Sequence, residues 1–407
     1  MESTERGRRA TPSLSVVVAI TSILLIAACD QNPVSTDPES NPRLAGVVTN
    51  LVTEEPVVGA YVSIGTDTVR TGLDGRYEFT TNKPGSATIR CAGAGYKEFV
   101  EEIVLPPEGM AFNIRLDRIE RFRFGDFALY VPGVVSRVRG VIVALGGPDT
   151  RGFTGAPFDA DLPELETALQ EAGKAMRTLA GETGLAILGT SRTRMASSTE
   201  TDQLIINMLE QAAVLSGRPE IADVPRILYG LSGGAPEASG FVMRNPEAVI
   251  GLFFKVPVGV DVAESSETAG IPTFIVLAEQ DASVDNIAIM QSFEASRSAG
   301  ALWGLAMEPG VPHLSLSAAQ RALTVQWMRD VVARRLPGET EAHELIALAE
   351  SDGWLGDMTT GAIIPHGESY DGDPSAVSWF PSQKIADAWQ DFALLPTPSS
   401  GGLGEGL

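Results

Sequence analysis

The sequence predicts a multidomain protein, in which an N-terminal all-β sandwich precedes a mostly parallel sheet covered by helices on both faces. Residues 43–118 hold short β-rich runs separated by turn residues, at the spacing typical of a sandwich. From residue 121 the pattern changes to buried apolar strands that alternate with amphipathic helices. A chain of 407 residues is long enough for each part to bury a core of its own.

The charge balance excludes one class of partner. The chain carries 30 basic and 52 acidic residues, a formal net charge of −22. Nucleic acids and anionic membrane surfaces are bound through basic patches, which this balance disfavours. We therefore expect no nucleic-acid partner and no direct electrostatic attachment to a membrane.

The N-terminus has the features of a targeting segment. Arg6, Arg8 and Arg9 precede an apolar run from Leu14 to Ala28 that is too short for comfortable membrane spanning. The run ends in Leu-Ile-Ala-Ala-Cys29, which resembles the signal of a bacterial lipoprotein over residues 1–28. A plain signal peptide or a single anchor helix is the alternative.

The lipoprotein resemblance implies a location and an anchor. It implies that Cys29 is lipidated, and that the protein is extracytoplasmic and held by this lipid on a bacterial membrane, at the periplasmic face or the cell surface. Residues 29–42 are polar and Pro-rich, as expected of a flexible tether. With Cys29 lipidated, Cys91 has no partner for an intrachain disulfide and cannot form a cysteine-based metal site.

The segment 43–118 resembles a known accessory module. A hairpin signal lies at Leu73-Asp-Gly-Arg-Tyr77, with glycine where a positive φ is needed. The runs starting at Pro56 and Thr71, followed by Gly95-Tyr96, resemble the carboxypeptidase regulatory-like domain, a transthyretin-like sandwich. The resemblance implies a spacer, a folding aid or an adhesive unit, and we expect a spacer between the membrane and the next domain.

The α/β domain is predicted over residues 121–336. We expect strands at 122–131, 141–145, 185–189, 227–229, 248–254, 271–278 and 302–307, and helices at 161–180, 200–216, 235–245, 284–299 and 316–335. Active sites in such sheets lie at the carboxyl ends of the strands.

One of these strand ends carries a nucleophile motif. The apolar run Ile227–Tyr229 leads into Gly-Leu-Ser232-Gly-Gly, followed by small residues that can open a helix. This is the G-x-S-x-G elbow between a strand and a helix. Glycines permit a strained turn and a close approach of strand and helix, while the helix N-terminus directs N–H groups toward developing negative charge. The alternative is a Gly-rich turn with an ordinary serine.

A serine nucleophile needs a base and a carboxylate that orients the base. The chain has three histidines, and His343 and His366 lie in the tail. His313 lies instead in a loop between a predicted strand and a predicted helix, and Asp281 follows the strand that begins at Ile271.

The chain order Ser232, Asp281, His313 resembles that of the α/β-hydrolase superfamily over about residues 121–335. We prefer Asp281 as the acid because it is nearer the strand end, with Asp285 and then Glu279 as alternatives.

The resemblance also implies an oxyanion hole of two backbone N–H donors. Gly233 supplies one, as the residue after the nucleophile. The other is expected from the loop Leu145-Gly-Gly147-Pro148, where Pro148 has no N–H to donate. We therefore select Gly147.

Two remaining segments bear on the substrate. The connection 255–270 is short and contains the polar run Glu264-Ser-Ser-Glu267, whereas lipases usually insert a larger, more apolar lid here, so the sequence favours an esterase over a lipase. The extension 337–407 holds three of the five tryptophans, at 354, 379 and 389, and a short helix is expected near 382–392. These rings either pack on the domain surface or form an aromatic platform for a substrate.

The sequence as a whole predicts a lipid-anchored serine hydrolase of the carboxylesterase type that uses no cofactor and no metal, with a small-molecule or polymer ester as substrate. A peptidase or acyltransferase with the same triad is one alternative. A cell-surface binding or adhesion protein with a non-catalytic hydrolase-like domain is the other.

Overall fold

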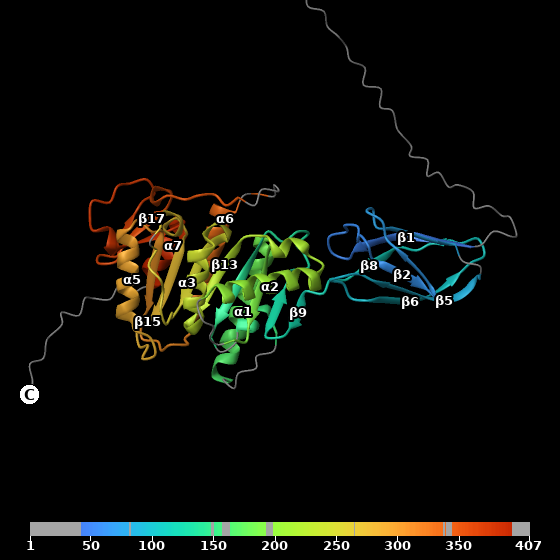
Figure 1. Cartoon of the computed structure of the whole chain (residues 1–407), viewed down its shortest axis with the longest axis horizontal. Coiled ribbons are helices and arrows are strands. Elements are labelled where there is room, and N and C mark those ends of the chain that lie inside the picture. Colours follow the sequence, from blue (N-terminus) through green and yellow to red (C-terminus); the bar gives the residue numbers. More distant parts are fainter. Residues whose placement is uncertain are drawn as a thin grey trace, which may run out of the picture.

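The computed structural model describes residues 42–80, 83–147, 150–156, 163–192, 198–263, 265–336, 338 and 344–392. The signal segment 1–28, Cys29 and nearly all of the tether lie outside these residues. A β-sandwich and a larger body of sheet and helices lie next to each other (Figure 1). Within the described residues, no helix has both the length and the apolar character that membrane crossing requires.

The N-terminal body consists of two four-stranded sheets that enclose one apolar core. Alternate side chains point inward, such as Leu44 and Val48 on the first strand, and both are fully buried. Cys91 lies in the same core as a free thiol, and burial raises its pKa to about 11. It therefore stays protonated and unreactive. One sheet contains β4 (Arg76–Thr80), β1 (Arg43–Asn50), β7 (Met110–Ala111) and β8 (Ile114–Leu116), and the other contains β3 (Asp67–Arg70), β2 (Tyr61–Ile64), β5 (Gly85–Ala92) and β6 (Phe99–Leu105).

The second body is built on an eight-stranded, mostly parallel sheet, as the sequence predicts. Only β10 runs antiparallel to the other strands. This arrangement is consistent with an α/β-hydrolase sheet. The spatial order is β16 (Trp303–Glu308), β15 (Thr273–Ala278), β14 (Val249–Lys255), β13 (Arg226–Leu231), β11 (Gly140–Gly146), β12 (Leu185–Thr190), β10 (Phe127–Tyr130) and β9 (Arg121–Phe124).

Helices cover both faces of this sheet. Side chains alternate along each strand, so Leu228 joins one core while Ile227 and Tyr229 join the other. The first core receives α2 (Thr199–Ser216), α3 (Ala235–Arg244) and α5 (Asn286–Ser298). The second receives α1 (Pro163–Thr183), α6 (Ala318–Arg335) and α7 (Gln383–Phe392).

The single strand expected at 122–131 is wrong, because the chain forms the hairpin β9–β10 there. Gly125 adopts a φ of 54° and reverses the chain before Phe127. Alternating apolar residues continue through this turn, which is why the pattern reads as one strand.

The C-terminal extension folds onto the edge of the main sheet. It contributes β17 (Trp354–Asp357), β18 (Ile363–Ile364), β19 (Val377–Phe380) and α7, of which only the helix was expected from the sequence. Trp379 and Trp389 are both 1% exposed, so these two rings pack in the interior. Trp354 is half-buried.

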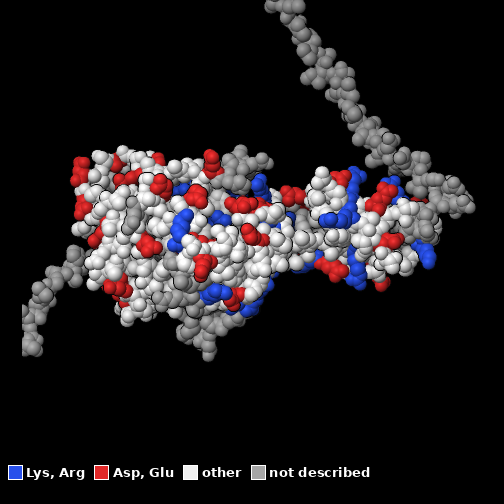
Figure 2. Space-filling view, viewed as in Figure 1, with Lys and Arg blue, Asp and Glu red and all other residues white. Residues whose placement is uncertain are grey.

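The surface carries charges of both signs. Figure 2 shows acidic and basic side chains interspersed on the face that it draws. On this face no basic area dominates the described part of the chain.

Trp389 provides a test of whether the extension is part of the folded core. Its indole Nε1–H donates to the carbonyl oxygen of Leu305 at 2.7 Å. Replacing Trp389 with Ala should lower the free energy of unfolding by about 3–5 kcal/mol, because a large buried side chain leaves a cavity. Denaturant unfolding measures this change. Trp389→Phe should cost less, and Leu73→Ala, at a position 89% exposed, should change stability by less than about 0.5 kcal/mol. A cost for Trp389→Ala as small as that of Leu73→Ala would contradict the packing.

Candidate active site

Ser232 lies at the turn between β13 and α3. Its φ is 49°, a left-handed conformation that is unusual for a residue with a side chain. Residues Ser232–Gly234 form a 3₁₀ turn, and α3 then begins at Ala235 with Pro236 in its first turn. The serine thus follows directly on a buried strand at the N-terminal end of a helix, as the elbow motif requires.

The strained turn is packed against the loop after β11. A Cβ atom on Gly234 would lie 2.2 Å from the carbonyl oxygen of Leu145. A Cβ atom on Gly146, whose φ is 78°, would lie 2.2 Å from the backbone nitrogen of Gly234. Only glycine fits at these two positions, because each touches backbone that cannot move aside.

The structure brings Ser232, Asp281 and His313 together. His313 Nε2 lies 2.8 Å from Ser232 Oγ, and His313 Nδ1 lies 2.6 Å from Asp281 Oδ2. The Asp281 side chain is fully buried, while that of His313 is 19% exposed. The three residues therefore form a continuous hydrogen-bonded chain that leads from a buried carboxylate to the serine hydroxyl.

The two alternative acids have other partners. Asp285 caps α5, where its side chain accepts a hydrogen bond from the Ala288 N–H at 3.1 Å. Glu279 accepts one from the Gly310 N–H at 2.7 Å. Of the other histidines, His366 is exposed and His343 lies outside the described residues.

Backbone hydrogen bonds tie the loop that carries Asp281 to the loop that carries His313. The Glu279 N–H donates to the Glu308 carbonyl oxygen, and the Gln280 N–H donates to the Val311 carbonyl oxygen, each at 3.0 Å. Both loops start at the carboxyl ends of paired strands, β15 and β16. The relative position of acid and base is therefore fixed by the sheet.

A buried ion pair lies close to this site, and the sequence reasoning missed it. Lys255 Nζ lies 3.2 Å from Glu308 Oε2, and the two side chains are 0% and 5% exposed. The pKa of Lys255 lies below its ordinary value, because burial lowers it by more than the charges of Glu308 and Asp281 raise it. The available signal was a lysine that closes the apolar run Gly251-Leu-Phe-Phe at a strand's carboxyl end.

The two glycines proposed as oxyanion donors flank the elbow. Gly233 follows Ser232, and Gly147 lies against Leu231, where an added Cβ would be 2.3 Å from a side-chain carbon. Gly147 also has a positive φ of 67°. Pro148 lies outside the described residues.

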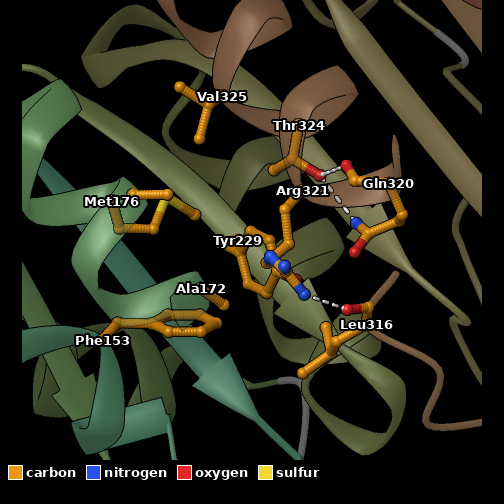
Figure 3. A pocket seen from close by; sticks show the side chains of 10 residues that line it. Phe153, Ala172, Met176, Tyr229, Leu316, Gln320, Arg321, Thr324 and Val325 are labelled. Atoms are coloured by element: carbon orange, nitrogen blue, oxygen red, sulfur yellow. Dashed lines mark hydrogen bonds between the residues drawn. The ribbon is translucent and has the colours of Figure 1, made fainter. Parts of the chain in front are cut away.

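A small cleft lies on the α1–α6 face of the sheet (Figure 3). Tyr229 and Leu316, each three positions from Ser232 or His313 along the chain, contribute to its mostly apolar lining. Gln320 adds a polar group, since its amide Nε2 donates to Thr324 Oγ1 while its buried Oε1 has no hydrogen-bond partner. Ser232 and His313 do not line the cleft, which lies beside the segments that carry these two residues.

No group of three or more His, Cys, Asp or Glu side chains suited to a metal ion occurs in the described part of the chain. The side chains that meet at this site offer a hydroxyl, an imidazole and a carboxylate.

The comparisons with known proteins reach only distant similarities. No protein-family model and no curated protein matches the chain. Among solved structures, a CIB-like hydrolase from Thermoplasma acidophilum is 13% identical, with a TM-score of 0.34, over 52% of this chain and 97% of its own. A thermostable esterase is also 13% identical, with a TM-score of 0.35, over 66% of this chain and 91% of its own. At such TM-scores neither likeness carries an argument about activity.

Substitutions can distinguish the roles of Asp281 and Asp285. Asp281→Asn should slow the reaction of Ser232 with a fluorophosphonate probe by roughly 10³- to 10⁴-fold, because the amide cannot hold His313 in the required tautomer. Asp285→Asn should leave the rate near that of wild type, since asparagine also caps helices. Labelling time courses measure both. Equal losses in the two variants would contradict the assignment of Asp281.

Proposed function

We propose that this chain is a serine hydrolase that cleaves carboxylic esters through an acyl-enzyme. The observation that carries the proposal is the chain of hydrogen bonds from Asp281 through His313 to Ser232 at the carboxyl edge of the sheet. A positive φ at Ser232 supports it, because strain of this kind is retained where it has a use.

The proposed reaction has two halves. Ser232 Oγ attacks the ester carbonyl while His313 Nε2 takes the hydroxyl proton, and Asp281 holds the imidazole through Nδ1–H. The tetrahedral oxyanion is stabilised by the N–H groups of Gly233 and Gly147. His313 then protonates the leaving alcohol as the acyl-enzyme forms. Water, deprotonated by His313, attacks the acyl carbonyl and releases the acid and the free serine.

The surroundings of the site favour compact esters. Among its described residues, the connection after β14 forms a single short helix, α4 (Ser266–Ala269), and the residues from Ser265 to Thr268 are polar. Long acyl chains need a larger apolar cover.

We further propose that the enzyme works outside the cytoplasm, anchored to a bacterial membrane by a lipid on Cys29. The signal-like sequence before Cys29 and the polar tether after it support this placement. The β-sandwich then separates the hydrolase from the membrane surface.

The first test is labelling of the detergent-purified full chain with a fluorophosphonate probe. Wild type should be labelled, whereas Ser232→Ala should not be, because it lacks the nucleophile, and His313→Ala should react at least about 10³-fold more slowly. Circular dichroism of each variant controls for folding. A folded wild type that is not labelled would overturn the proposal and favour a binding protein.

A panel of p-nitrophenyl esters tests the substrate class. We expect kcat/KM to be highest for acetate and butyrate and to fall by at least about tenfold for palmitate, because the described residues near the site form no large apolar cover that could bury the chain. Aminoacyl anilides serve as the comparison for peptidase activity. Faster cleavage of palmitate or of the anilides would contradict the proposed specificity.

A further inference from the structure

The ion pair between Lys255 and Glu308 has no part in the reaction as described above. Lys255 ends β14 and Glu308 ends β16, with Nζ and Oε2 3.2 Å apart and almost no solvent exposure. Removing two charges from water costs free energy that their attraction only partly offsets. Two apolar side chains would serve packing equally well, so the pair points to a role beyond stability.

The pair spans the strand that leads to Asp281. Neighbouring strands lie about 4.8 Å apart, so β14 and β16, on either side of β15, are separated by about 10 Å. Lys255 pairs in register with Val276, and Glu308 pairs with Ala278 two residues further along β15. Lys255 and Glu308 therefore meet across β15 near its end, just before the loop that holds Asp281.

Three charged groups thus share a buried region. Of the charges on the described residues, those that act on Lys255 are the carboxylates of Glu308 and Asp281. β13 contributes Leu231 beside Lys255 and the phenol of Tyr229, whose pKa is raised by burial so that it stays neutral. The helix α6 covers this face of the sheet and contributes apolar residues such as Trp327 to the same core.

Two buried carboxylates that lie near each other with no cation beside them destabilise each other's ionised form, so protonation of one of them becomes more favourable. A protonated Asp281 could no longer balance the positive charge that His313 acquires during the reaction. The ammonium group of Lys255 prevents this, because it offers a positive charge to both acids.

We propose that Lys255 is a positioning residue of the site, which keeps Asp281 ionised in the presence of Glu308. The inference rests on the proposed function of Ser232, His313 and Asp281. Glu308 in turn makes the burial of Lys255 possible, and its backbone carbonyl holds the Asp281 loop through the Glu279 N–H.

The test is the pH dependence of fluorophosphonate labelling of the full chain between about pH 5 and 9, a range set by the histidine base. In Lys255→Met, the uncompensated charges of Asp281 and Glu308 should favour protonation of one of them, which should move the acid limb of the profile to higher pH by about one unit or more. The rate on that limb should fall about tenfold as a result.

Glu308→Gln removes the negative partner of the same ion pair. Asp281 then faces Lys255 alone, so the acid limb should not move to higher pH. In the double variant Lys255→Met/Glu308→Gln only one acid remains, and the limb should return toward that of wild type. The melting temperature of each variant controls for stability.

A purely structural pair would leave the pH profile unmoved in every folded variant, or move it in the same direction in both single variants. Either result would overturn the inference. Should Lys255→Met fail to fold, Lys255→Gln is measured in its place, because it also removes the positive charge, and an unmoved acid limb in that variant would overturn the inference. Absence of labelling in wild type would instead reject the proposed function itself.

Discussion

The structure of the site depends on one backbone contact, that between the turn at Ser232 and the loop after β11. Ser232 has a positive φ, which costs free energy unless the surroundings hold it. Gly146 and Gly234 meet there without side chains, and β11 and β13 are paired up to Gly146 and Leu231. The serine hydroxyl therefore projects from the sheet edge at a fixed place, and His313 and Asp281 reach it from β16 and β15.

The positions of the charged groups at the site are also fixed by the sheet. A buried aspartate can orient a histidine only while it is ionised, and burial by itself favours its neutral form. The basic residue Lys255 and a second acid, Glu308, lie on the strands on either side of β15, and their side chains meet across it. Asp281 follows β15, so all three residues lie near the ends of adjacent strands. The electrostatics of the site thus depend on strand register as much as on local loops.

The sequence predicts those features that rest on local patterns. Apolar runs locate the parallel strands, and Gly-Leu-Ser-Gly-Gly locates the elbow, because its turn can be made only by small residues. The ion pair could not be predicted, since Lys255 and Glu308 are far apart in the chain and meet only through the strand order. The hairpin at Gly125 was missed because apolar residues alternate on both sides of its turn, and the short strands of the extension were missed because two to four residues give too little periodicity. The separation of Asp281 from Asp285 also needed the fold, which shows one beside His313 and the other capping α5.

The C-terminal extension bears on the site through the edge strand β16. An edge strand has unpaired backbone groups, and here the extension satisfies two of them with side chains. Ser378 Oγ accepts a hydrogen bond from the Leu305 N–H at 3.0 Å, and Trp389 Nε1 donates to the Leu305 carbonyl oxygen. β16 is the strand that carries Glu308 and leads into the loop of His313. A segment outside the α/β domain predicted from sequence therefore holds in place the strand that leads to His313.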